Sequence, residues 1–328
     1  MTEPTGLLET VRGFLPDCQG LVGLRRLSGG ASQETWSFDA SFSGGQLPLI
    51  LRRNGGGPPR ERLHAVTLAQ EAMLIRLADE VGTPVPKVMA VLPDGHPAGA
   101  GFIMSRVEGE TLPRKTLRDE RFANARPKLA HQCGEILARL HAIPLAKVPP
   151  LRVAPPRVEL DHYLKQHRGY QYPRPVLELA FRWLADNAPP DDMPLSLVHG
   201  DFRHGNLMID EQGVAAVLDW ELAHVGDPME DLGWLCVNSW RFGYPLPVGG
   251  FGTREQLFAG YEAGGGARVD PQRVRYWEIL GTLKWGVMCE SFVQAFRDGY
   301  DRSVERAAIG RRSSETEIDL LRLLTGRS

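Results

Sequence analysis

Cysteine is scarce in this sequence. Only four cysteines occur among 328 residues, and no two of them form a C-x-x-C pair. That spacing argues against a zinc ribbon and against a redox-active dithiol. Isolated cysteines of this kind are typical of buried thiols in a reducing compartment. The four are Cys18, Cys133, Cys236 and Cys289.

Long apolar runs and a strong excess of one charge are missing as well. No stretch approaches the ~18 to 20 apolar residues that a membrane span requires. The N-terminal segment MTEPTGLLETVRGF lacks the apolar run of a secretory signal. A formal net charge of −2 provides no polycationic face for nucleic acid. We therefore expect a cytoplasmic protein with no membrane and no nucleic-acid partner, and the oligomeric state stays open.

The patterns that are present predict an α+β chain of two lobes. Residues 1–105 are expected to form a small lobe with an antiparallel sheet and one long helix, at about 62–80. From residue 117 onward the apolar positions recur every three or four residues, so 106–328 is expected to form a larger, mainly helical lobe. The five predicted strands of the small lobe are 21–27, 35–42, 47–53, 87–92 and 101–106.

The segment LVHGDFRHGNLMIDEQGVAAVLDWELAHVGDPMED, at 197–231, carries the strongest chemical signal. Phosphoryl transfer needs a carboxylate to orient the attacking hydroxyl and oxygen ligands for Mg²⁺. Asp201 fits the first role, and Asn206 with Asp219 fits the second. Asp201 and Asn206 enclose four residues, as in a kinase catalytic loop. A hairpin over 207–218 would return Asp219 beside Asn206. The competing interpretation is a polar loop whose Asp and Asn only form turns.

Two neighbours of Asp201 in the same segment are further candidates. Arg203 could contact the transferred γ-phosphate and offset its developing charge. The alternative for Arg203 is a surface ion pair with Asp210 or Glu211. His199 is interpreted as a residue that holds the backbone in place, because a general base contributes little to a reaction with a metaphosphate-like transition state.

The small lobe supplies the candidate nucleotide contacts. The loop containing Gly29, Gly30 and Ser32 lies between the first two strands, where small residues let backbone N–H groups approach phosphates. A cation on the third strand, Arg52, would lie beneath this loop. Glu71 falls on the apolar stripe of the long helix, which predicts an inward carboxylate paired with Arg52 rather than a solvated one.

The segment at the end of the fifth strand is a candidate for the nucleotide base. It lies where the pattern changes from strand to helix, between the two expected lobes. Backbone groups of Ser105 to Val107 are expected to receive the adenine edge in that crevice. The same pattern is also typical of an ordinary strand exit.

At this point the sequence resembles the aminoglycoside phosphotransferase and choline kinase superfamily. The resemblance rests on His199-Gly200-Asp201 with Asn206 and on Asp219-Trp220-Glu221. The stretch 226–232 is most similar to the branch that contains the kinase-like domains of some acyl-CoA dehydrogenase fusion proteins. The resemblance implies a protein-kinase-like fold, ATP or GTP in the interlobe cleft, Asp201 as the base, and Asn206 and Asp219 as Mg²⁺ ligands. Where most relatives carry lysine on the third strand, this chain has Arg52, which is not equivalent to lysine.

The expected function is transfer of the γ-phosphoryl group of ATP or GTP to a hydroxyl of a small metabolite or antibiotic. A catalytically silent nucleotide-binding protein is the main alternative, and a transition-metal hydrolase using His199, Asp201 and His204 is a further one. Aromatic residues of the helical lobe are candidates for the acceptor wall or for the core. They include Tyr163, Tyr170, Trp240, Tyr244, Trp277 and Trp285.

Overall fold

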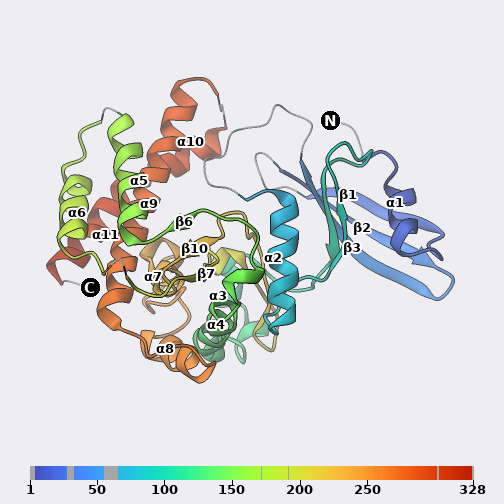
Figure 1. Cartoon of the computed structure of the whole chain (residues 1–328), viewed down its shortest axis with the longest axis horizontal. Helices are drawn as coiled ribbons and strands as arrows, with labels where there is room; N and C mark the ends of the chain where they lie inside the picture. The colour runs from blue at the N-terminus through green and yellow to red at the C-terminus, as the bar shows by residue number, and fades with distance from the viewer. Residues whose placement is uncertain are drawn as a thin grey trace.

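The computed structural model describes residues 4–27, 33–54, 66–170, 172–190, 192–300 and 303–326. The chain forms two lobes, with a sheet at the N-terminal end and a larger helical body at the C-terminal end (Figure 1). This is the predicted α+β organisation. The sheet ends at Ser105, and 105/106 is retained as the proposed lobe boundary.

The small lobe contains a five-stranded antiparallel sheet with strand order β1-β2-β3-β5-β4. The predicted hairpin at 43–45 is present, since Phe42 pairs with Gly45. All five predicted strands are confirmed within a few residues. They are β1 (Gly20–Leu27), β2 (Gln33–Phe42), β3 (Gly45–Asn54), β4 (Val88–Leu92) and β5 (Gly101–Ser105), and the helix α1 (Leu7–Phe14) precedes them.

The long helix of the small lobe, α2 (Leu68–Glu80), begins later than predicted. Thr67 caps it, because its hydroxyl accepts a hydrogen bond from Gln70 N while the Gln70 side chain accepts from Thr67 N. This reciprocal pair satisfies amide groups that a helix start leaves free. The sequence predicts a helix from about residue 62, but residues 66 and 67 are not helical, so the prediction is wrong there. Residues 62–65 lie outside the described residues.

The large lobe is mainly helical, and it contains two small sheets. The hairpin of β8 and β9 was predicted, whereas the sheet β6-β10-β7 was not, because strands of two or three residues show no periodicity. Its helices are α3 (Pro113–Arg118), α4 (Arg126–His141), α5 (Pro156–Gly169), α6 (Pro175–Asp186), α7 (Met229–Cys236), α8 (Arg254–Ala263), α9 (Pro271–Arg297), α10 (Val304–Gly310) and α11 (Ser313–Thr325). Its strands are β6 (Val153–Ala154), β7 (Ser196–Val198), β8 (Leu207–Ile209), β9 (Val214–Val217) and β10 (His224–Gly226), with short 3₁₀ turns at Glu120–Phe122, Leu145–Lys147, His204–Asn206 and Asn238–Trp240.

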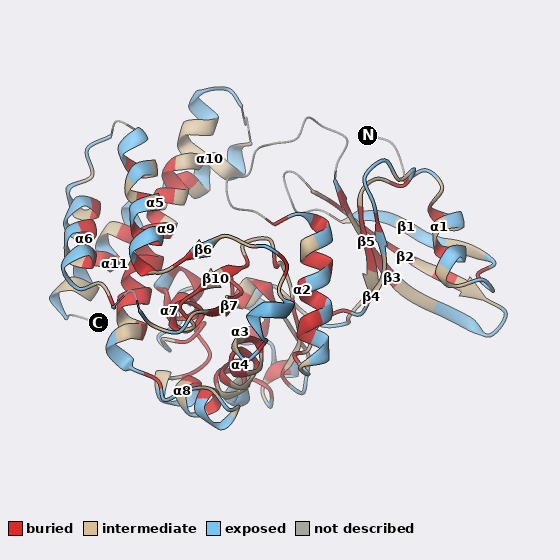
Figure 2. Ribbon diagram, viewed as in Figure 1, coloured by how far each residue is buried: buried red, intermediate tan, exposed pale blue. Residues whose placement is uncertain are grey.

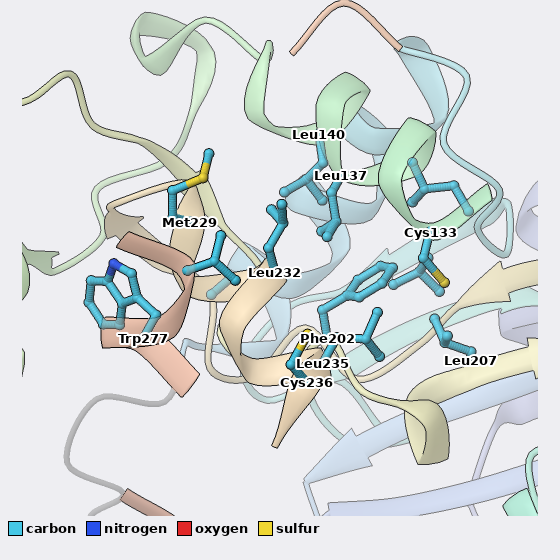
Figure 3. Packing of buried hydrophobic residues seen from close by; sticks show 14 of the residues in the cluster. Cys133, Leu137, Leu140, Phe202, Leu207, Met229, Leu232, Leu235, Cys236 and Trp277 are labelled. Carbon is cyan, nitrogen blue, oxygen red and sulfur yellow. The ribbon is translucent and has the colours of Figure 1, made fainter. Parts of the chain in front are cut away.

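The largest hydrophobic core extends from α2 into the helical lobe, and a second core lies between the sheet and α1. Buried residues line the interior of both lobes in Figure 2. Figure 3 shows Phe202 and Leu207 among the side chains of the larger core. Phe202 lies within the predicted catalytic loop and Leu207 directly follows it, so core packing anchors the loop at both positions. Among the described residues, no helix is both long enough and apolar enough to cross a bilayer.

Candidate active site

The loop after β7 is held in place by a buried carboxylate from α7. The backbone N–H groups of His199 and Gly200 donate to Asp231 over 2.8 and 2.9 Å. His141 contacts the same carboxylate at 3.1 Å. Burial would raise the pKa of Asp231, but these hydrogen bonds and the nearby histidines hold it below its ordinary value. Sequence reasoning assigned Asp231 no role.

Asp201 lies in the same loop, and its carboxylate accepts hydrogen bonds from three side chains. Arg203 Nε lies 3.1 Å from Oδ1, and Asn206 Nδ2 lies 2.7 Å from Oδ2. Trp234 Nε1 donates to Oδ1 over 2.9 Å. Asp201 itself is nearly buried, at 9% exposure. The structure therefore brings Asp201, Arg203 and Asn206 together, and it adds Trp234, which sequence reasoning missed.

The predicted hairpin brings Asp219 back toward Asn206. Leu207 pairs with Val217, and Leu218 N donates to Asn206 O over 2.9 Å at the base of the hairpin. Asp219 follows immediately, with a left-handed φ of +65°. Aspartate is one of the few residues apart from glycine that adopts this conformation readily. The two predicted metal ligands therefore leave the same end of one hairpin.

Arg52 connects the two lobes at this point. Its Nη2 donates to Asp219 Oδ1 over 2.8 Å, and its Nε lies 3.2 Å from Glu71 Oε2. Glu221 Oε2 lies 3.6 Å from the same Nη2. The predicted inward pairing of Glu71 with Arg52 is confirmed, and the solvated alternative is wrong because Glu71 is 1% exposed. Burial raises the pKa of Glu71 to about 7, although Arg52 opposes that shift.

The surface alternative for Arg203 is wrong. Its guanidinium contacts Asp201 and lies 4.8 Å from the ring centre of Trp240. Glu211 instead pairs with Arg121 at 3.1 Å. Arg203 is therefore held next to the central carboxylate and does not form the expected surface ion pair.

The two histidines of the loop have structural contacts. His199 is fully buried, and its Nδ1 accepts from Asp201 N at 3.3 Å, as expected for a residue that holds the backbone in place. His204 uses both ring nitrogens, with Nε2 at 2.7 Å from Thr116 Oγ1 and Nδ1 at 2.6 Å from Gly249 O. Burial lowers the pKa of His204 to about 4. Because His204 has no free nitrogen, the transition-metal alternative is wrong.

The predicted nucleotide contacts of the small lobe are described only in part. Gly29, Gly30 and Ser32 lie outside the described residues. Ser105 N donates to Lys87 O over 2.9 Å within the small lobe. Val107 N donates to no described residue, so Val107 keeps a backbone donor available for a base and Ser105 does not.

The donor set at the hairpin base suits Mg²⁺. Asn206 Nδ2 donates to Asp201 O at 3.0 Å and to Asp201 Oδ2, which leaves Asn206 Oδ1 as an oxygen donor. Asp219 is part-exposed, with 32% of its side chain accessible, and one of its oxygens binds Arg52. In kinase sites Mg²⁺ is usually bound by a few oxygen ligands from the protein, and the substrate phosphates supply further ligands.

The two lobes and the polar cluster at their junction define a protein-kinase-like architecture. The chain belongs to the phosphotransferase enzyme family, whose model matches residues 23–277. It is 29% identical over 236 residues to acyl-CoA dehydrogenase family member 11 of Gallus gallus. That match covers 70% of this chain and 29% of the relative, so the chain spans less than a third of that protein's length.

Solved structures have the same fold. A Ralstonia eutropha protein assigned to the aminoglycoside phosphotransferases is 20% identical, with a TM-score of 0.76 and 98% coverage of both chains. A thermostable aminoglycoside phosphotransferase variant, solved with AMP-PNP and hygromycin B, is 17% identical with a TM-score of 0.61. It covers 97% of this chain and 98% of that one. The predicted family, branch and fold are confirmed.

Proposed function

We propose that this protein is a kinase that transfers the γ-phosphoryl group of ATP or GTP to a hydroxyl of a small molecule. One observation carries the proposal: Asp201, Asn206 and Asp219 converge at the base of one hairpin, at the junction of the two lobes. Family membership and a fold shared with a protein solved with AMP-PNP and hygromycin B support it.

In the proposed reaction Asp201 orients the acceptor. The acceptor hydroxyl donates a hydrogen bond to the Asp201 carboxylate, and its oxygen attacks the γ-phosphorus. The new O–P bond forms as the bond to the β-phosphate oxygen breaks, and the hydroxyl proton passes to Asp201. Arg203 lies beside this carboxylate and offsets charge on the transferred group.

Other residues are proposed to hold the nucleotide. Asn206 and Asp219 would hold Mg²⁺, which supplies positive charge next to the phosphates when bound. Arg52, which pairs with Glu71, is proposed to contact the phosphates, and Val107 is proposed in preference to Ser105 to bind the base. Gly29, Gly30 and Ser32 stay predicted phosphate contacts. The lobe roles, 1–105 for nucleotide and 106–328 for acceptor, and a cytoplasmic location also stay predictions.

The tryptophans predicted for the acceptor wall lie in different surroundings. Trp277 is fully buried and donates to Asp227 over 2.7 Å, which is a core role. Trp240 is also buried, at 5% exposure, but it lies next to Arg203 and its ring centre is 4.9 Å from that of Trp285. We propose that the acceptor binds on the Trp240 side of Asp201.

A substrate screen tests the proposed function. The purified protein is incubated with Mg²⁺, ATP or GTP, and panels of hydroxyl-bearing metabolites and antibiotics, and phosphorylated products are measured. Asp201→Asn is expected to bind nucleotide but to lose transfer by about 100-fold to 10,000-fold. Full activity of this variant on an identified acceptor would refute the role of Asp201. Nucleotide binding without transfer to any acceptor or to water would instead favour the catalytically silent alternative.

A further inference from the structure

A buried indole from α7 contacts the central carboxylate of the site. Trp234 Nε1 donates to Asp201 Oδ1 over 2.9 Å, and Trp234 is only 2% exposed. The two residues are 33 positions apart in the sequence. A hydrogen bond from a buried donor to a carboxylate is among the stronger ones in proteins.

The donors are distributed unequally over the two oxygens of Asp201. Oδ1 accepts from Trp234 and from Arg203 Nε at 3.1 Å, while Oδ2 accepts from Asn206 at 2.7 Å and from Arg203 Nε at a longer 3.3 Å. Each carboxylate oxygen accepts about two hydrogen bonds. The longest of these contacts, Arg203 Nε at 3.3 Å, is on Oδ2, so a hydroxyl that displaced the longest contact would bind Oδ2.

The indole ring is itself fixed by its neighbours. Lys284 Nζ lies 4.8 Å from the ring centre of Trp234 and donates to Gly200 O over 3.2 Å. Glu230 Oε1 lies 3.5 Å from the same ammonium group. The ring of Trp240 packs against Trp234, with centres 5.1 Å apart. One buried cation on α9 thus supports both the indole and the backbone next to Asp201.

We propose that Trp234 is a positioning residue for phosphoryl transfer, one that fixes Oδ1 of Asp201 so that Oδ2 faces the acceptor hydroxyl. The inference rests on the proposed function and adds a residue to it. Catalysis of phosphoryl transfer depends chiefly on positioning and electrostatics, so a rotated carboxylate lowers turnover without weakening nucleotide binding.

The test replaces Trp234 with phenylalanine, which keeps an aromatic ring and removes the N–H. Trp277→Phe is the matched control, because Trp277 is 1% exposed and its indole also donates to an aspartate, Asp227, at 2.7 Å. Turnover is measured with Mg²⁺ and ATP, using the acceptor from the screen and also water as acceptor. Trp234→Phe is expected to lower kcat about tenfold to a hundredfold. The KM for ATP is expected to change less than about twofold, because the nucleotide contacts are unchanged.

A double-mutant cycle separates positioning from general damage. In the Asp201→Asn background, Trp234→Phe is expected to cause no further loss of kcat, because its effect passes through that carboxylate. A second measurement requires no change at Trp234. In ¹⁵N-labelled Asp201→Ala protein, the indole N–H signal of Trp234 is expected to move upfield, while that of Trp277 stays in place.

The outcomes distinguish this inference from the proposed function. Equal kcat losses in Trp234→Phe and Trp277→Phe, or an unmoved indole signal, would overturn the role of Trp234 and leave the kinase proposal intact. Absence of turnover by the wild-type protein, with every acceptor and with water, would overturn both.

Discussion

Arg52 Nη2 lies 2.8 Å from Asp219 Oδ1 and so joins β3 of the small lobe to the hairpin base of the large lobe. The same guanidinium pairs with the buried Glu71 on α2. Two different nitrogens of the guanidinium face the two carboxylates, whereas a lysine would have to serve both with a single compact ammonium group. An arginine therefore suits this position, which lies between the carboxylates of Asp219 and Glu71.

The first prediction concerns this buried pair. Arg52→Met leaves Glu71 without its cation, and we expect a loss of about 3 kcal/mol in the free energy of unfolding. Urea denaturation at pH 8 measures it. The double variant Arg52→Met/Glu71→Gln should recover most of the loss, because the only fully buried carboxylate among the described partners of Arg52 is then neutral, while Asp219 and Glu221 are part-exposed. Equal stability of the single and double variants would show that the pair is not coupled.

The second prediction concerns Asp219. Asp219→Ala should weaken Mg²⁺-dependent binding of ATP by at least about tenfold, because a proposed metal ligand is removed. Calorimetry with and without Mg²⁺ measures this. Asp210→Asn is the control, since Asp210 lies in the turn of the same hairpin, where it accepts from Gln212 N. Similar Mg²⁺ dependence in Asp219→Ala and the wild-type protein would contradict the metal role.

The third prediction follows from His204. Its folded-state pKa is lowered from 6.5 to about 4 by burial, so the unfolded chain binds a proton that the folded protein does not. Stability should therefore fall as the pH drops from about 6.5 to about 4, by up to about 1.4 kcal/mol per pH unit. His204→Gln should reduce the slope of unfolding free energy against pH by the amount that corresponds to about one proton. An unaltered slope in His204→Gln would refute the prediction.

The fourth prediction concerns the carboxylate that holds the catalytic loop. Asp231→Ala removes the acceptor for His199 N and Gly200 N. Leaving buried donors unpaired is expected to cost about 3 kcal/mol in the free energy of unfolding. Asp231→Asn keeps one oxygen acceptor and should cost less. Thermal and urea denaturation rank the three proteins, and a greater loss for asparagine than for alanine would contradict this interpretation.

The sequence predicted the part of the site that is local along the chain. Asp201, Asn206 and Asp219 lie within one segment, and a strand-turn-strand pattern was enough to bring them together. Trp234 and Lys284 could not be placed in the same way. They reach the loop from helices 33 and 84 residues further on, and helical periodicity predicts burial but not which buried side chains meet.

The fold shows the same difference between elements that are local along the chain and elements that join distant segments. The long strands of the small lobe and the hairpin at 207–218 have clear patterns and turns, so they were predicted. The sheet of β6, β7 and β10 joins pieces from three distant parts of the chain, and none exceeds three residues. Helix α2 began later than its apolar pattern suggested because the capping pair of Thr67 and Gln70 determines its first turn. In that case local capping chemistry overrode periodicity.

Several side chains anchor helix α9 to other parts of the chain, and three of them are spread along its length. Trp277 donates to Asp227 near its start, Lys284 donates to Gly200 near its middle, and Glu290 accepts from Arg174 toward its end. Each residue added to or removed from an α-helix rotates everything beyond it by about 100°. A one-residue insertion or deletion between these anchors would turn at least one of them away from its partner. Length variation among related chains should therefore be confined to the connecting loops, while α9 keeps a constant number of residues between its anchors.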